Sequence, residues 1–139
     1  MADCCEDTRP KEGGAQCCGD GNCKKVLLYA CSGAANVAEV ADRVVRDLMA
    51  GGEGKMFCLA GLGARIEAMV QTARDADANV VIDGCTLDCG KKIFDDLGLT
   101  NFTHVRVTDL GIEKVEGARA TDEEVDDIIE EVRKVLKDL

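Results

Sequence analysis

The stretch NVVIDGCTLDCGKK, which spans Asn79 to Lys92, joins an apolar run to a more polar segment. The run Asn79–Asp83 is short and apolar, as is typical of a strand that is buried on both faces. From about Thr86 onward, apolar side chains recur at helical spacing. The stretch therefore predicts a strand that leads directly into a helix, with two cysteines, Cys85 and Cys89, at the junction.

The same strand–helix unit occurs twice before this stretch. KVLLYA, Lys25–Ala30, precedes a helical face that ends before Gly51 and Gly52 and consists of Val37, Val40, Ala41, Val44, Val45, Leu48 and Met49. KMFCLA, Lys55–Ala60, precedes a second helical face, made of Ile66, Met69, Val70 and Ala73. Each segment predicts one strand followed by one amphipathic helix.

A fourth unit follows. FTHVRVTDL, Phe102–Leu110, is the fourth predicted strand. Thr121 and Glu124 match a capping box, in which each side chain accepts a hydrogen bond from the backbone N–H of the other residue at the start of a helix. The predicted helix has an apolar face made of Val125, Ile128, Ile129, Val132, Val135, Leu136 and Leu139.

The alternation of four strands with four helices predicts the fold class. It indicates a three-layer α/β domain with a four-stranded, mostly parallel sheet and helices on both faces. Right-handed crossovers and a central first strand give the strand order 2-1-3-4, as in flavodoxin-like and Rossmann-like folds.

The composition predicts one domain and one tail. With 139 residues, of which 46% are hydrophobic, the chain has room for a single core, which we assign to residues 24–139. Residues 1–23 have almost no aliphatic side chains, and we expect them to form a flexible, cysteine-rich N-terminal tail. The cysteines of this tail are Cys4, Cys5, Cys17, Cys18 and Cys23.

The charge and the hydropathy pattern exclude several classes of partner. A formal net charge of -10 with no basic patch opposes binding to nucleic acid or to anionic lipid. No apolar run approaches the ~20 residues that a membrane span requires, and the N-terminus lacks the pattern of a signal peptide. We therefore expect no nucleic-acid partner, no membrane association and a cytoplasmic protein; a protein partner or small-molecule substrate is left open.

Nine cysteines in a cytoplasmic chain indicate metal binding or thiol chemistry rather than disulfides. Cys31 follows the first predicted strand, Cys58 lies late in the second, and Cys85 follows the third. The two intervals between them are 27 residues each, which is one strand–helix period. Parallel strands place these three thiols at the same edge of the sheet, the carboxyl edge, where open α/β folds bind their ligands.

Cys89 completes a set of four. A helix that begins near Thr86 places Cys85 and Cys89 one turn apart, so that both sulfurs project to one side. The free N–H groups at a helix N-terminus also favour a thiolate. The sequence therefore predicts a Zn²⁺ site with four cysteine ligands, Cys31, Cys58, Cys85 and Cys89, although an iron–sulfur cluster can use the same ligands.

Several blocks resemble a known family. DGC at residues 83–85, together with CSGAANVAEVADRV, KMFCLAGLGARI and VTDLGIEK, is similar to the DGC-domain family of candidate zinc-binding proteins. The resemblance covers roughly residues 25–114. It implies a small cytoplasmic prokaryotic protein whose four candidate chelating cysteines match Cys31, Cys58, Cys85 and Cys89. It names no reaction.

Other uses of the same thiols stay open. Cys85 with Cys89, or Cys17 with Cys18, could exchange with a disulfide, and the tail could receive or transfer metal. Cys31 before a glycine-containing loop also fits a cysteine phosphocarrier. If Cys58 only fills the core, three ligands and a water remain and catalysis becomes possible; four cysteine ligands close the site, so whether the protein is an enzyme is left open.

Five further residues flank the predicted site or its strands. Asp83 and Asp88 could accept hydrogen bonds from groups around a metal, but such acids more often cap a helix start. His104, the only histidine, is expected to be hydrogen-bonded rather than to bind metal. Gly61 and Gly63 are expected to let the chain turn from strand to helix.

Overall fold

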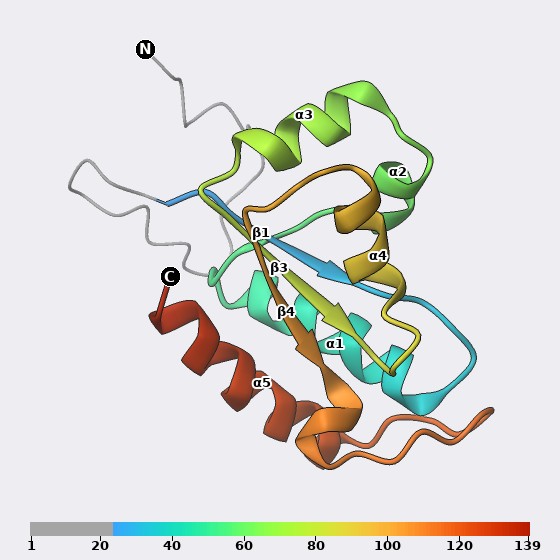
Figure 1. The fold of residues 1–139 in the computed structure, drawn as a ribbon. Coiled ribbons are helices and arrows are strands. Elements are labelled where there is room, and N and C mark those ends of the chain that lie inside the picture. The colour runs from blue at the N-terminus through green and yellow to red at the C-terminus, as the bar shows by residue number, and fades with distance from the viewer. Residues whose placement is uncertain (1–23) are drawn as a thin grey trace, which may run out of the picture.

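A four-stranded parallel sheet forms the centre of the protein in a computed structural model that describes residues 24–139 (Figure 1). The strands are β1 (Val26–Ala30), β2 (Lys55–Met56), β3 (Ala78–Asp83) and β4 (Phe102–Arg106). Their order is β2-β1-β3-β4, so the predicted order 2-1-3-4 is confirmed. Residues 1–23, with the predicted tail and its five cysteines, lie outside the described residues.

The register places the ends of β1 and β3 side by side. Ala30 pairs with Ile82 at the carboxyl end of this pair, and the N–H of Cys31 extends the ladder by donating to the carbonyl of Ile82 at 3.1 Å. In the same way, β3 pairs with β4 up to Asp83 and Arg106. The residues that follow β1 and β3 therefore begin from adjacent positions at one edge of the sheet.

Helices cover both faces of the sheet, as predicted (Figure 1). One face packs against α1 (Asn36–Ala50) and α5 (Asp122–Lys137), with core residues that include Val40, Val44 and Ile128. The other face is covered by α2 (Leu59–Gly63), α3 (Glu67–Asp75) and α4 (Cys89–Asp96), around Tyr29 and Phe94. These two apolar layers are the cores that the helical periodicity predicts.

The predicted start of α5 is confirmed in detail. The Thr121 side chain accepts a hydrogen bond from the N–H of Glu124 at 3.2 Å, and the Glu124 carboxylate accepts one from the N–H of Thr121 at 2.9 Å. This capping box satisfies backbone donors that have no partner within the helix.

The second unit differs from the prediction. The strand predicted over Lys55–Ala60 is only Lys55–Met56, because Cys58 already caps α2. Gly61 and Gly63 lie inside this short helix, rather than in a turn before it. The helix predicted around Ile66 and Ala73 is α3, but only Ala73 of that apolar face is fully buried.

The fourth unit is shorter than predicted as well. β4 ends at Arg106, and Val107–Leu110 form the 3-10 helix η1 in place of the rest of the strand predicted to Leu110. Residues 111–120 then cross to α5 without regular helix or strand. Because this segment follows the carboxyl end of β4, it starts at the same edge of the sheet as Cys31 and Cys85.

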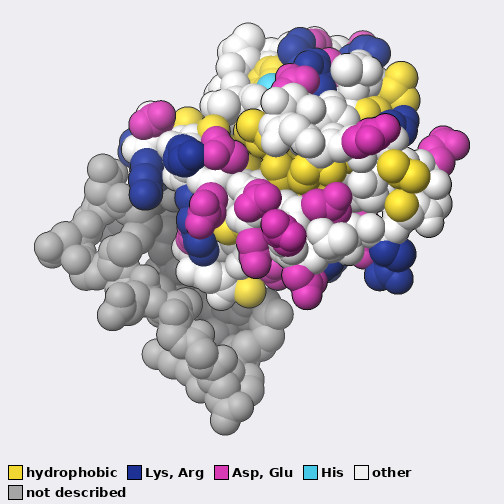
Figure 2. Space-filling model, turned by 90° about the horizontal axis from the view of Figure 1, so that it is seen from below, with side chains coloured by type: hydrophobic (Ala, Val, Ile, Leu, Met, Phe, Trp, Pro, Cys, Tyr) yellow, Lys and Arg dark blue, Asp and Glu magenta, His cyan; other side chains and the backbone are white. Residues whose placement is uncertain are grey.

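The surface of the protein carries many acidic side chains, as the formal net charge of -10 indicates. Seen from below, acidic side chains are grouped beside a band of apolar side chains (Figure 2). None of the helices within residues 24–139 has the length and apolar character needed to cross a membrane.

Candidate functional site

One pocket, of about 220 Å³, lies at the carboxyl ends of β1 and β3. Three of the four predicted site cysteines line it: Cys31, Cys85 and Cys89. The remaining wall comes from the loop that precedes α1, from the loop that precedes α4, and from Lys114 and Glu116. The structure thus brings together thiols from three separate segments, at the edge of the sheet where the sequence predicts them.

Cys31 lies at the end of β1, in the wall of the pocket. It is half-buried, and its Sγ accepts a hydrogen bond from the N–H of Gly84 at 3.1 Å. Burial raises the pKa of the Cys31 thiol to about 11, and the nearby Asp83 carboxylate adds to the rise, although the bond from Gly84 partly offsets it. Cys31 is therefore a protonated thiol at neutral pH.

Gly84 allows the site to form. A Cβ built on this residue would lie 2.9 Å from the carbonyl carbon of Val37 and 3.0 Å from the backbone nitrogen of Ala38. These are backbone atoms of α1, which cannot move aside as a flexible side chain can. Only glycine therefore lets the β3–α4 loop approach α1 closely enough to place its N–H on Cys31 and the next residue, Cys85, in the pocket.

Cys85 is half-buried and faces a cation. The Nζ of Lys114 lies 3.6 Å from the Sγ of Cys85, within hydrogen-bonding range for sulfur. The two residues are 29 positions apart, and residues 111–120 bring them together. This contact places a positive charge beside one of the three thiols.

Cys89 is exposed and is the first residue of α4, so the predicted helix start near Thr86 is wrong. Asp88, directly before it, has a positive φ of 53°, and its N–H donates to the carbonyl of Cys85 at 3.2 Å. This turn separates the two cysteines. Cys85 lies in the loop and Cys89 is the first residue of the helix, so the two cysteines are not one turn apart on the same helix.

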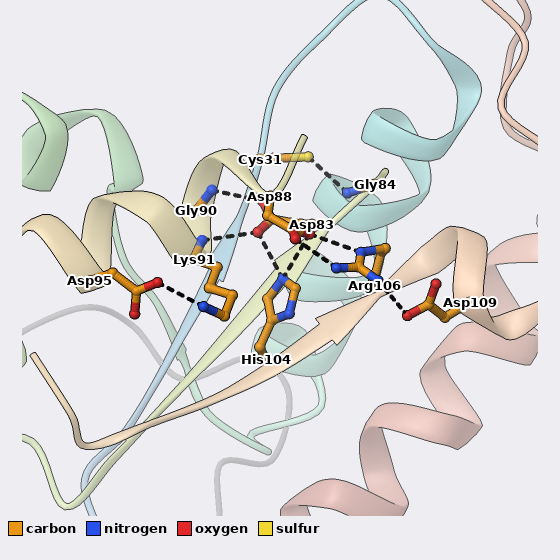
Figure 3. Close-up of polar contacts among 10 residues, drawn as sticks. All are labelled: Cys31, Asp83, Gly84, Asp88, Gly90, Lys91, Asp95, His104, Arg106 and Asp109. Carbon is orange, nitrogen blue, oxygen red and sulfur yellow. Dashed lines mark hydrogen bonds and ion pairs between the residues drawn. The ribbon is translucent and has the colours of Figure 1, made fainter. Parts of the chain in front are cut away.

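Asp83 caps α4 from the end of β3. Its carboxylate, only 1% exposed, accepts hydrogen bonds from the N–H groups of Gly90 at 2.8 Å and Lys91 at 3.0 Å (Figure 3). The expectation that this acid caps the helix start is therefore met by Asp83. The two N–H groups it occupies are no longer free to stabilise a thiolate at Cys89, contrary to the expectation from the helix N-terminus.

Asp88 and His104 complete a network around Asp83 (Figure 3). Nε2 of His104 lies 2.9 Å from Oδ2 of Asp83, so its expected hydrogen-bonded role is met. Arg106 donates to both oxygens of Asp88, at 2.8 Å and 2.6 Å, and also bonds Asp109 at 2.8 Å. The paired guanidinium lowers the pKa of Asp88.

One group of potential metal ligands within residues 24–139 has all its ligand atoms within 4.8 Å of one another. It consists of Asp83, Asp88 and His104. Their acceptor atoms are already engaged by α4 and by Arg106. This arrangement is typical of a structural charge network. The three pocket sulfurs line one cavity without reaching the same spacing, so a shared metal requires their side chains to turn toward it.

Cys58 occupies a different position from the one predicted. It caps α2, where its Sγ accepts a hydrogen bond from the N–H of Gly61 at 3.4 Å, and it is exposed. The pocket lining does not include it. Both Cys58 and Cys89 stand at helix N-termini on the same face of the sheet, because α2 packs against α4.

Two residues that shape the site, Lys114 and Asn36, were not identified from the sequence. Lys114 lies in the block VTDLGIEK that carries the family resemblance, but nothing in its spacing links it to a cysteine. Asn36 is buried at the start of α1, and its role depends on contacts with residues 113–115. An asparagine next to a predicted helix start is the signal that could have drawn attention to it.

Comparison with known proteins agrees with the resemblance. The DGC domain matches residues 27–132. A Pseudomonas aeruginosa protein named anaerobic and virulence modulator AnvM is 28% identical over 110 residues, which cover 79% of this chain and 84% of the relative. No solved structure matches the chain.

Proposed function

Because this chain belongs to the DGC-domain family, we propose that its cysteine pocket is a Zn²⁺-binding site. The observation that carries the proposal is the convergence of Cys31, Cys85 and Cys89 on one cavity from the end of β1, the β3–α4 loop and the start of α4. Cysteine thiolates are preferred ligands of Zn²⁺, and three from separate segments give a metal the means to tie those segments together.

Cys58 is the fourth ligand of the proposed site. Its side chain is exposed, and its sulfur accepts a hydrogen bond from the N–H of Gly61. Binding to a metal would replace this hydrogen bond. Four thiolates close a tetrahedral site and leave no position for an activated water. The proposed function is therefore metal binding, without a proposed reaction, in a reducing compartment such as the cytoplasm.

Metal transfer is a second candidate function. Cys58 and Cys89 are exposed, whereas Cys31 and Cys85 are half-buried. A metal held by two inner and two outer thiols can be passed to an acceptor by exchange of the outer ligands first. A bound zinc that a competing thiol chelator removes within seconds supports transfer; a zinc that stays for hours supports a structural site.

The experiment that tests zinc binding must separate the pocket from the N-terminal cysteines. We suggest the full chain with Cys4, Cys5, Cys17, Cys18 and Cys23 replaced by serine, purified with reductant and without chelator. About one zinc per chain, measured by mass spectrometry, is expected if the site has four thiolate ligands. In the same background, Cys31→Ser or Cys85→Ser should abolish stoichiometric zinc.

Three results decide between the alternatives. Loss of zinc from the five-serine variant itself would assign the metal to the N-terminal cysteines and overturn the proposal. Zinc that persists in Cys58→Ser but is lost in Cys89→Ser would leave a three-cysteine site with an open position. A visible iron chromophore in place of zinc would assign an iron–sulfur cluster to the same ligands.

A further inference from the structure

Residues 111–120, here called the strap, join η1 to α5 and supply Lys114 and Glu116 to the pocket wall. The strap has no regular secondary structure, apart from a single bridge between Ala35 and Glu116. Its shape must therefore come from contacts with the rest of the domain. Two side chains of α1, Asn36 and Glu39, bond the strap at two places.

Asn36 fixes the backbone on both sides of Lys114. Its side-chain amide donates to the carbonyl of Glu113 at 2.9 Å and accepts from the N–H of Val115 at 2.8 Å. The backbone N–H of Asn36 also donates to the carbonyl of Val115 at 3.2 Å. Asn36 is only 4% exposed, and a buried amide is stable only when its donors and acceptors are bonded in this way.

Glu39 fixes the far end of the strap. Its carboxylate accepts from Arg119 through two nitrogens and from the N–H of Ala120 at 2.9 Å. The bonds from Arg119 and Ala120 lower the pKa of Glu39 to about 2, so this anchor stays charged at all physiological pH values. The strap is therefore held at its middle and at its end.

This anchoring determines where the ammonium group of Lys114 lies. Among the described residues that line the pocket, Lys114 supplies the basic side chain. The lining also contains three thiols and three acidic side chains, those of Asp83, Asp88 and Glu116. Its Nζ lies 3.6 Å from the Sγ of Cys85. Four thiolates around Zn²⁺ carry a net charge of about -2, which nearby cations must offset.

We propose that Lys114, placed by Asn36, is a positioning residue of the cysteine site, whose charge offsets the negative charge of the thiolates at Cys85. This inference rests on the proposed zinc function and adds to it a cation supplied by the strap. It explains why a buried asparagine bonds the two residues that flank an exposed lysine.

The test measures zinc affinity by competition with a chromophoric chelator, in the full chain with the five N-terminal cysteines replaced by serine. Lys114→Ala is expected to weaken zinc binding about fivefold in 50 mM salt, the upper end for an exposed charge pair. The difference should fall below about twofold in 1 M salt, where the Debye length is about 3 Å. Lys114→Arg should retain most of the affinity.

The matched control is Lys92→Ala. Lys92 is an exposed lysine of α4 outside the pocket lining, so this variant changes the net charge equally without removing the cation at Cys85. An equal loss in Lys92→Ala and Lys114→Ala would assign the effect to overall charge and overturn the proposal. A Lys114→Ala effect that does not depend on salt would do the same.

Asn36→Ala tests the positioning step. It should reproduce the loss seen in Lys114→Ala, and the double variant should lose no more than Asn36→Ala alone, because the two residues act as one unit. Additive losses would show that Asn36 acts on the fold alone. If Asn36→Ala does not fold, Asn36→Asp, which keeps the acceptor for Val115, replaces it.

One further measurement separates this inference from the proposed function. If the five-serine protein binds no zinc, the proposed function fails. The rate at which iodoacetamide alkylates Cys85 in that metal-free protein then tests Lys114 independently. A slower rate in Lys114→Ala, with an unchanged rate at Cys89, supports the placed charge; equal rates at Cys85 in both proteins refute it.

Discussion

Nε2 of His104 lies 2.9 Å from Oδ2 of Asp83, and this contact joins β4 to the cap of α4. The carboxylate of Asp83 also accepts hydrogen bonds from the N–H groups of Gly90 and Lys91. One buried carboxylate in the wall of the cysteine pocket therefore links two strands and a helix. The arrangement fixes where α4 begins, and with it the position of Cys89.

Asp83→Ala is expected to lower the free energy of unfolding by about 2 kcal/mol, because it leaves buried helix N–H groups without an acceptor. Asp83→Asn should cost less, since the amide oxygen can still accept from one N–H. Urea denaturation followed by circular dichroism measures both. Asp95→Ala is the control: its carboxylate forms an exposed pair with Lys91, and the expected loss is below about 0.5 kcal/mol. Equal losses at Asp83 and Asp95 would contradict the capping role.

Gly84→Ala is expected to destabilise the protein by about 2 kcal/mol, because its Cβ would press against the backbone of Val37 and Ala38. The forced shift should also move Cys85 away from the pocket and reduce zinc binding. Gly33→Ala is a matched control in the same pocket wall, since a Cβ there meets only the Cβ of Ala38 at 3.7 Å. A thermal melt of the two variants decides the point, and similar melting temperatures would argue against the close approach at Gly84.

The fold was predictable because it depends on local patterns. Apolar residues at helical spacing identify α1 and α5, and short apolar runs identify β1 and β3. The handedness of parallel crossovers then leaves few possible orders, and 2-1-3-4 is the one observed. The placement of Cys31 and Cys85 at the same edge of the sheet follows from this topology.

The remaining features depend on contacts between distant residues. The start of α4 at Cys89 is set by the cap from Asp83, six residues earlier, and by the positive φ of Asp88. The residue types at positions 86–88 predict neither the cap from Asp83 nor the positive φ of Asp88. Lys114 approaches Cys85 from the strap, which Asn36 and Glu39 hold, and such an aperiodic segment has no sequence pattern that predicts its path.

Thr121→Ala should lower the free energy of unfolding by about 1 kcal/mol, the usual cost of removing an N-cap. The cap bonds the N–H of Glu124, and its loss frees the first turn of α5. Thr86→Ala, at an exposed turn position, should change stability by less than about 0.5 kcal/mol. Denaturant titrations of both variants test this expectation, and a loss at Thr86 as large as that at Thr121 would show that the capping box contributes little.

Cys31 should be slow to react in the metal-free protein at pH 8. Burial raises its pKa to about 11, so its thiolate population there is about a hundredfold below that of a thiol with the ordinary value of 9.0. Alkylation by iodoacetamide, followed by peptide mass spectrometry, compares Cys31 in the folded protein with the same residue in urea. The folded rate should rise with pH up to about 11.

The same shift links stability to pH. The folded state keeps the Cys31 proton between pH 9 and about 11, whereas the unfolded state releases it. The contribution of this thiol to the free energy of unfolding is therefore complete below about pH 9 and is lost as the pH rises to about 11. Cys31→Ser does not titrate in this range, so the difference in unfolding free energy between it and the parent protein should change across that window. A difference that stays constant from pH 8 to pH 11 would mean that the Cys31 thiol is not desolvated by the fold.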